Sequence, residues 1–118
     1  MNDDKLGELT LKLKKFANDR DWNQFHSPKN LAMALTVEAA ELMEHFQWLT
    51  EEESLALSDE KREPVALEMA DVFLYLLRMA DMLNIDLLHA AEKKFAINEQ
   101  RYPAARVKGR SDKYTEYE

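Results

Sequence analysis

The 118-residue sequence contains no cysteine, only two glycines and only three prolines. The absence of cysteine excludes disulfide bonds and thiolate metal sites, and it fits a reducing compartment. Few turn-forming and few β-branched residues argue against a β-sheet, so we predict an all-α fold. No apolar run approaches the ~20 residues that span a bilayer. We therefore expect a soluble, cytoplasmic protein without a membrane partner.

The sequence also lacks an excess of basic residues, because its formal net charge is −7. This charge argues against general nucleic-acid binding. A polyanionic small molecule could still bind through a metal ion and nearby lysines. At this length we expect one domain, spanning residues 1–118, that is small enough to gain from association with other subunits.

Hydrophobic spacing and capping residues predict four long helices. We expect them to begin after Asp3 or Asp4, at Ser27-Pro28, at Ser58 and at Asp86, with the second ending near Trp48 and the third near Leu83. Thr50 and Glu53 have the form of a capping box, which predicts a short additional turn. The helical core should span about residues 4–102. Residues 103–118 are polar and aperiodic, and this cationic tail is either a solvated end or a lid for phosphates.

Two pairs of carboxylates lie in apolar surroundings on the second and third long helices. Glu38 with Glu41, and Glu68 with Asp71, are each three residues apart and therefore share a helix face. Burying unpaired negative charge is costly, so four such acids need cations. An all-oxygen ligand set suits magnesium or manganese, provided that the two helices are neighbours in a bundle. Alternatively, the acids pair with arginine or lysine, or face solvent.

Two further groups of residues could contact a ligand. The aromatic and polar segment Trp22-Asn-Gln-Phe-His26 follows the first helix, and its aromatic side chains bury surface either against the core or against a ligand. Lys94 and Asn98 lie four residues apart on the predicted fourth helix, so they either face a site together or form an ordinary exposed pair.

The two acid motifs, placed on two helices of a chain of this length, resemble the MazG-like superfamily of all-α nucleoside triphosphate pyrophosphohydrolases. Residues 20–31, 44–48, 97–98, 101–104 and 113–116 are similar to its dCTP pyrophosphatase branch. The resemblance covers nearly the whole chain, from about Leu9 to Glu116. It implies a four-helix-bundle subunit with an extended C-terminal tail.

The resemblance also implies an activity. This is Mg²⁺-dependent hydrolysis between the α and β phosphates of a nucleotide, dCTP or a modified dCTP, in nucleotide-pool sanitation; Mn²⁺ can substitute. The implied metal ligands are Glu38, Glu41, Glu68 and Asp71. A carboxylate that is not fully engaged could accept the proton of the attacking water, and Glu38 and Glu41 are the catalytic candidates.

The substrate-binding residues that the resemblance implies are Trp22, Gln24, Phe25, His26, Trp48, Tyr75, Lys94, Asn98 and Lys113. One position departs from the pattern, because relatives carry a histidine substrate contact where this chain has Leu13. The implied assembly is a homotetramer, a dimer of dimers, in which Lys113 could close over a neighbour's phosphates. Two other classes of function stay open: a non-catalytic nucleotide sensor, and a helical interaction protein whose acids are solvated.

Overall fold

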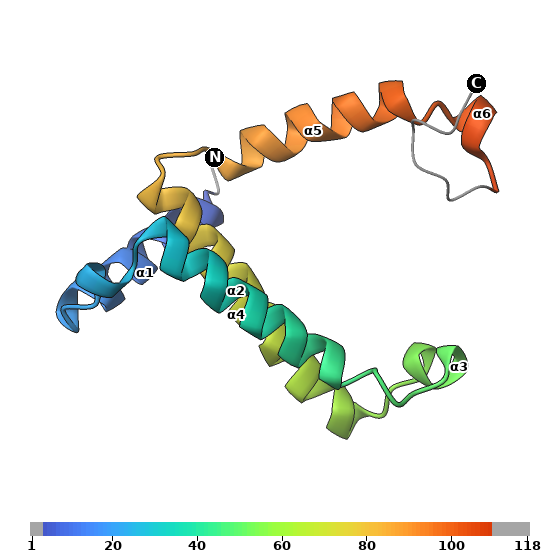
Figure 1. Ribbon diagram of the computed structural model, residues 1–118, viewed down its shortest axis with the longest axis horizontal. Helices are drawn as coiled ribbons and strands as arrows, with labels where there is room; N and C mark the ends of the chain where they lie inside the picture. The colour runs from blue at the N-terminus through green and yellow to red at the C-terminus, as the bar shows by residue number, and fades with distance from the viewer. Residues whose placement is uncertain (1–3, 110–118) are drawn as a thin grey trace. The chain divides into compact units, whose positions relative to one another are not determined.

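A computed structural model describes residues 4–109, and these residues contain helices and no strand (Figure 1). The prediction of an all-α fold is thereby confirmed. The elements are α1 (Lys5–Asp19), the 3₁₀ helix η1 (Asn23–Phe25), α2 (Pro28–Glu44), α3 (Glu51–Leu55), α4 (Asp59–Met82), α5 (Leu87–Arg101) and α6 (Ala104–Val107). In this part of the chain, no helix is both long enough and apolar enough to cross a membrane.

The chain divides into two compact units between Asn84 and Ile85. The first unit contains α1 to α4, and the second contains α5 and α6. The candidate carboxylates and the aromatic segment all belong to the first unit. The interpretation of residues 1–118 as one domain stays a prediction.

Local capping fixes where the long helices begin, as the sequence predicts. Four side-chain oxygens each accept a hydrogen bond from the backbone N–H three residues later, which satisfies a donor that the first helical turn leaves unpaired. These oxygens belong to Asp4, Ser27, Ser58 and Asp86. The capping box is also present, because Thr50 N–H donates to Glu53 and Glu53 N–H donates back to the Thr50 hydroxyl.

Two element boundaries differ from the expected ones. Helix α2 ends at Glu44 rather than near Trp48. After Glu44, the backbone N–H groups of His45, Phe46 and Leu49 donate to carbonyls three residues earlier, so the chain tightens into turns. In the expected tail, α6 forms one further helical turn.

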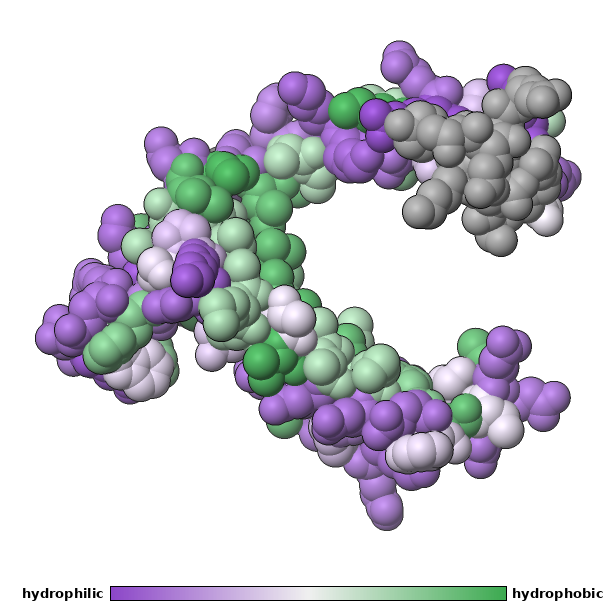
Figure 2. All heavy atoms as spheres, in the orientation of Figure 1, coloured by the Kyte–Doolittle hydropathy of each residue, from purple (hydrophilic) through white to green (hydrophobic). Residues whose placement is uncertain are grey.

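Helix α4 is the central helix of the first unit, because α2 and α1 both pack against it. The buried apolar residues of these three helices are Ala17 on α1, Leu31 on α2, and Val65, Leu77 and Ala80 on α4. The prediction that the two carboxylate-bearing helices are neighbours is confirmed. Large apolar side chains also remain at the surface of this pair, where Figure 2 shows hydrophobic residues gathered.

Candidate functional site

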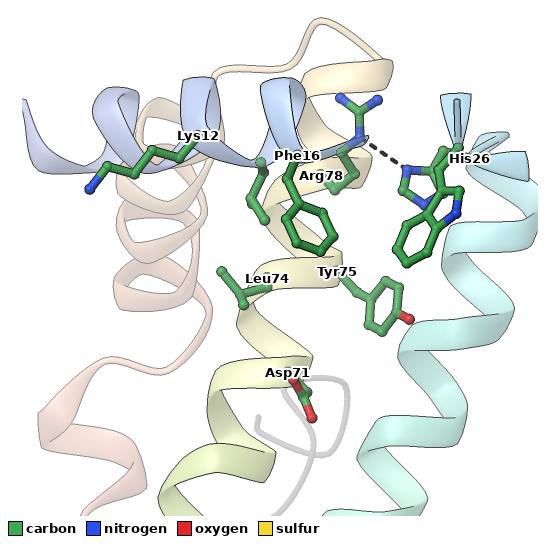
Figure 3. A pocket seen from close by; sticks show the side chains of 9 residues that line it. Lys12, Phe16, His26, Asp71, Leu74, Tyr75 and Arg78 are labelled. Carbon is green, nitrogen blue, oxygen red and sulfur yellow. Dashed lines mark hydrogen bonds between the residues drawn. The ribbon is translucent and has the colours of Figure 1, made fainter. Parts of the chain in front are cut away.

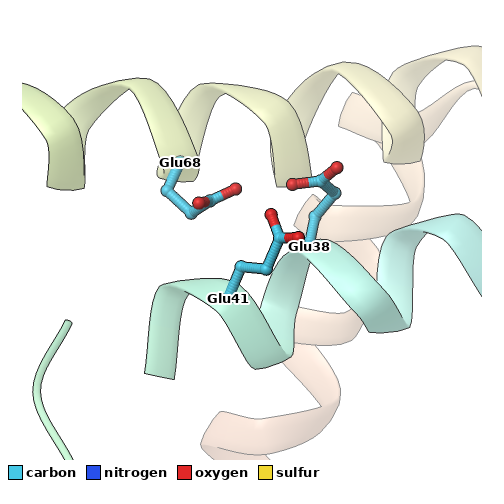
Figure 4. A group of neighbouring side chains, drawn as sticks. All are labelled: Glu38, Glu41 and Glu68. Carbon is cyan, nitrogen blue, oxygen red and sulfur yellow. The ribbon is translucent and has the colours of Figure 1, made fainter. Parts of the chain in front are cut away.

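Three of the four predicted carboxylates converge between α2 and α4. Glu38 and Glu41 project from α2 toward Glu68 on α4 (Figure 4). Each residue offers one carboxylate oxygen, and these three oxygens all lie within 4.8 Å of one another. In addition, Glu38 Oε2 is buried and has no hydrogen-bond partner. A buried unpaired oxygen is costly, so a cation could stabilise this one. The nearby basic side chain is His45, whose Nε2 lies 3.8 Å from Glu68 Oε1.

The crowding of negative charge changes the acidity of two of these groups. The pKa of Glu38 lies above its ordinary value because it contacts the Glu68 carboxyl group, is partly desolvated, and feels the charges of Glu68 and Asp71. Contact with the Glu38 carboxyl group and its charge likewise raise the pKa of Glu41. A divalent cation would remove this repulsion, and an all-oxygen set fits a hard ion such as Mg²⁺ or Mn²⁺.

A second feature of the first unit is a cavity of about 390 Å³, within the size range of small-molecule sites (Figure 3). Its wall is formed by α1, the segment after α1, and α4. The lining residues are Lys12, Leu13, Phe16, Trp22, His26, Asp71, Leu74, Tyr75 and Arg78. The wall is largely apolar and aromatic, with a few charged groups.

The aromatic part of the wall is built by edge-to-face packing. The Phe16 and Trp22 ring centroids are 5.6 Å apart, with planes at 72°. The Trp22 and His26 centroids are 6.2 Å apart, with planes at 63°. Such arrangements hold aromatic rings in defined orientations, so Trp22 is positioned before a ligand arrives.

The segment that carries Trp22 and His26 is fixed at several points. Asp21 adopts a left-handed backbone conformation with φ of 55°, and the next N–H, that of Trp22, donates to Ala17 O over 2.9 Å. At the far end, the Asn30 side-chain amide donates to Phe25 O over 3.1 Å. The segment therefore leaves α1 and enters α2 through specific hydrogen bonds.

Asp71 connects the carboxylate cluster to the cavity. It lies outside the group of three converging oxygens, yet it lines the cavity and its charge contributes to the raised pKa of Glu38. Through Asp71, the cavity therefore adjoins the acids that could hold a metal.

The structure places the other predicted substrate residues in different surroundings. Trp22, His26 and Tyr75 line the cavity, whereas Gln24 does not and uses its amide N–H to reach Asp21. Two large side chains are exposed, Phe25 at 59% and Trp48 at 87%.

The remaining predicted contacts lie beyond the first unit. Lys94 and Asn98 are exposed residues of α5 in the second unit, and Lys113 is outside the described residues. The ligand-binding roles of all these residues stay predictions.

Four lining residues were not predicted from the sequence, namely Lys12, Phe16, Leu74 and Arg78. Arg78 had a visible signal, because it is the only basic residue in the apolar stretch of residues 72–80. A cation in such a stretch is seldom buried without partners. It is buried here, at 5% exposure.

The carboxylate cluster predicts how stability changes with pH in the metal-free protein. Because the pKa values of Glu38 and Glu41 are raised above 4.5, the folded state binds protons more tightly than the unfolded state. Their contribution is fully present below pH 4.5 and is lost as the pH rises through the raised values. The lowered pKa of His26, caused by burial and by Arg78, acts in the opposite direction.

The contribution of Glu38 is therefore measured as a difference. The melting temperature of metal-free Glu38→Gln minus that of the unsubstituted protein should increase from pH 4.5 to pH 7. A difference that stays constant over this range would show that Glu38 is not repelled by its neighbours.

Comparisons with known proteins agree with this arrangement. The MazG-like family model matches residues 33–117. The chain is 45% identical over 104 residues to dCTP pyrophosphatase 1 of Homo sapiens and 41% identical over 104 residues to that of Mus musculus. These matches cover 86% of this chain but 61% of each relative, so the chain spans about three fifths of their length.

A solved structure extends the similarity to the fold. The chain matches a pyrophosphatase from Archaeoglobus fulgidus with a TM-score of 0.82 and 36% identity. The match covers 87% of this chain and 96% of the archaeal one. Together with the converging acids of α2 and α4, these findings show that the chain belongs to the MazG-like family.

Proposed function

We propose that this protein is a Mg²⁺-dependent nucleoside triphosphate pyrophosphohydrolase that converts dCTP, or a modified dCTP, to the monophosphate and pyrophosphate. The observation that carries the proposal is the carboxylate cluster with its unpartnered Glu38 oxygen, joined through Asp71 to an aromatic cavity. The names of the mammalian relatives support dCTP as the substrate. The archaeal structure supports pyrophosphate chemistry.

Glu38, Glu41, Glu68 and Asp71 would hold the metal, and their oxygen atoms suit Mg²⁺, with Mn²⁺ as a substitute. When bound, such an ion neutralises phosphate charge and makes nearby water more acidic. The protein's own task is to keep Glu38, Glu41 and Glu68 converged despite their repulsion, with Asp71 one turn along α4 from Glu68. It does so by placing them on two packed helices rather than on loops.

Glu38 or Glu41 accepts the proton of the attacking water in this proposal. Of the two, the carboxylate that the metal engages less would be the one free to take up the proton. Burial of Glu38 Oε2 also keeps that oxygen free of competing hydrogen bonds. In this step the water oxygen bonds to the α phosphorus, the bond from that phosphorus to the α–β bridging oxygen breaks, pyrophosphate leaves, and one water proton passes to the carboxylate.

The cavity takes the nucleoside in the same proposal, with Trp22 and Tyr75 contacting the base and sugar. We assign Lys94 and Lys113 to phosphate, and Asn98, Gln24, Phe25 and Trp48 to base recognition, as the family resemblance implies. Leu13 does line the cavity. An apolar side chain there, in place of a histidine, leaves base selection to the remaining polar groups.

We further propose that the protein is a cytoplasmic homotetramer. Support comes from large apolar side chains that stay exposed on α2 and α4, including Met33, Val37, Met43, Leu67 and Phe73. Leu77 of α4, by contrast, is buried within its own chain. Light scattering coupled to size-exclusion chromatography would measure the mass; a monomer at micromolar concentration would contradict the proposal.

The activity is tested by pyrophosphate release from dCTP, 5-methyl-dCTP, dTTP, dUTP and dATP with Mg²⁺. We expect fastest release from dCTP or its 5-methyl form, equimolar monophosphate, and no release in EDTA. Calorimetric binding of dCTP without turnover would indicate the nucleotide sensor instead. The absence of both dCTP binding and pyrophosphate release would favour the helical interaction protein.

Replacing Trp22 tests the cavity separately from the acids. Trp22→Ala should raise KM for the preferred nucleotide by about 10-fold, because loss of one base-stacking aromatic costs roughly 1–3 kcal/mol. Trp22→Phe keeps an aromatic face and should raise KM much less. Equal KM values for Trp22→Ala and the unsubstituted protein, with the fold verified by circular dichroism, would exclude stacking on this residue.

A further inference from the structure

Arg78 is a buried cation whose three guanidinium nitrogens donate to three different residues. Its Nε donates to His26 Nδ1 over 3.2 Å, and its Nη1 donates to Asp81 Oδ2 over 3.1 Å. Its Nη2 donates to Asn23 Oδ1 over 2.6 Å. His26 and Asn23 belong to the segment between α1 and α2, so one residue of α4 ties this segment to the helix (Figure 3).

The bond to His26 fixes where the imidazole proton lies. A guanidinium group has donors and no acceptor, so His26 Nδ1 must accept and cannot carry a proton. A neutral imidazole whose Nδ1 is unprotonated has its proton on Nε2. If Nδ1 were protonated, its N–H would face the Nε–H of Arg78, so the hydrogen bond would be lost, and a second positive charge would lie beside Arg78.

We propose that Arg78 is a positioning residue that holds His26 as the neutral Nε2–H tautomer, so that His26 presents a hydrogen-bond donor to a ligand in the cavity. The ligand part of this inference rests on the proposed nucleotide function. The state of the imidazole does not.

The charges around His26 favour this state. Burial and the positive charge of Arg78 lower the pKa of His26 below 6.5, which keeps the ring neutral at physiological pH. Asp81 faces Arg78 rather than the imidazole and balances part of its charge. The other titratable groups that line the cavity are Lys12, Asp71 and Tyr75.

A donor at this position restricts which edge of a base can face it. A carbonyl oxygen or an unprotonated ring nitrogen can accept a hydrogen bond from Nε2–H. An exocyclic amino group cannot, because its own N–H groups are donors and would face the Nε2–H donor. In a cytosine nucleotide, the acceptors are O2 and N3. The cavity would therefore take cytosine with this edge, and not its amino group, toward His26.

The first experiment needs no nucleotide. Long-range ¹H–¹⁵N correlation spectra of the 118-residue protein at neutral pH should show His26 with a proton on Nε2 and none on Nδ1. In Arg78→Gln, the pH at which His26 takes up a proton should rise toward 6.5. A proton on Nδ1 of the unsubstituted protein, or an unchanged His26 titration in Arg78→Gln, would overturn the proposal.

A second variant separates positioning of the imidazole from anchoring of the segment. Asn23→Ala removes the Arg78 Nη2 contact but leaves the bond between Arg78 Nε and His26. It should therefore keep the His26 tautomer and titration of the unsubstituted protein. If Asn23→Ala shifts the titration as much as Arg78→Gln does, Arg78 acts only through the segment, and the proposal is wrong.

Kinetics test the donor itself. His26→Gln retains an N–H donor near the position of Nε2, whereas His26→Leu has none. His26→Leu and Arg78→Gln should each raise KM for dCTP about 10-fold with a much smaller change in kcat, and His26→Gln should stay within about 3-fold. Equal increases in KM for His26→Gln and His26→Leu would show that no donor is needed. If the unsubstituted protein does not hydrolyse dCTP, the proposed function fails, and the spectra alone still decide the role of Arg78.

Discussion

Replacing Glu38 by glutamine should lower kcat/KM for the preferred nucleotide by about 100-fold or more. The substitution keeps the size of the side chain but removes the negative charge whose buried oxygen has no other partner. Loss of one ligand to a phosphate-neutralising ion costs several kcal/mol of transition-state stabilisation, and each 1.36 kcal/mol is tenfold in rate. Calorimetric titration with Mg²⁺ should show weaker binding in the same variant.

The matched control for this prediction is Glu63→Gln, which changes an exposed glutamate on α4 outside the cluster. Its kcat/KM should stay within about twofold of the unsubstituted value, as expected for a surface substitution away from the site. The metal-free Glu38→Gln protein should be at least as stable as the original at pH 7, because it relieves repulsion. Full activity in Glu38→Gln would remove the carboxylate cluster from the mechanism.

Truncating Leu31 to alanine should lower the free energy of unfolding by about 3 kcal/mol, within the range for buried leucines. Leu31 is 2% exposed and lies in the first turn of α2, the helix that carries Glu38 and Glu41. The lost contacts leave a cavity that the neighbouring helices can close only in part. Urea unfolding followed by circular dichroism measures the change.

Leu11 on α1 provides the comparison, because it is the same residue type at 67% exposure. Leu11→Ala should change the free energy of unfolding by no more than about 0.5 kcal/mol. A loss below 1 kcal/mol for Leu31→Ala would mean that α2 is not held by this part of the core. In that case Leu31→Ala should stay active up to the same temperature as the unsubstituted protein, whereas we expect it to lose activity at a lower temperature.

The helical fold could be predicted well from the sequence because its signals are local. Each N-terminal cap requires a side chain and a backbone N–H three residues apart, as at Ser27 and Ser58. The end of α2 could not be located in this way. No glycine or proline occurs in residues 45–50, directly after Glu44, and the turns there are visible only in the backbone hydrogen bonds.

The candidate site could be predicted only in part, since its pieces meet through helix packing. The spacing of Glu38 and Glu41 indicated a shared face, but it could not show that Glu68 would join them while Asp71 turned to the cavity. The contacts of Arg78 with His26 and Asn23 span 52 and 55 residues. No periodicity within a helix contains information about such a pairing.

The left-handed backbone at Asp21 limits which amino acids evolution or an engineer can place there. A φ of 55° suits aspartate, asparagine and glycine, whereas a β-branched side chain at this angle is strained. Natural variation at this position should consequently be narrow, although the side chain itself is exposed to solvent. A library that randomises the segment to alter base preference would do best to leave this residue fixed and vary the positions that line the cavity.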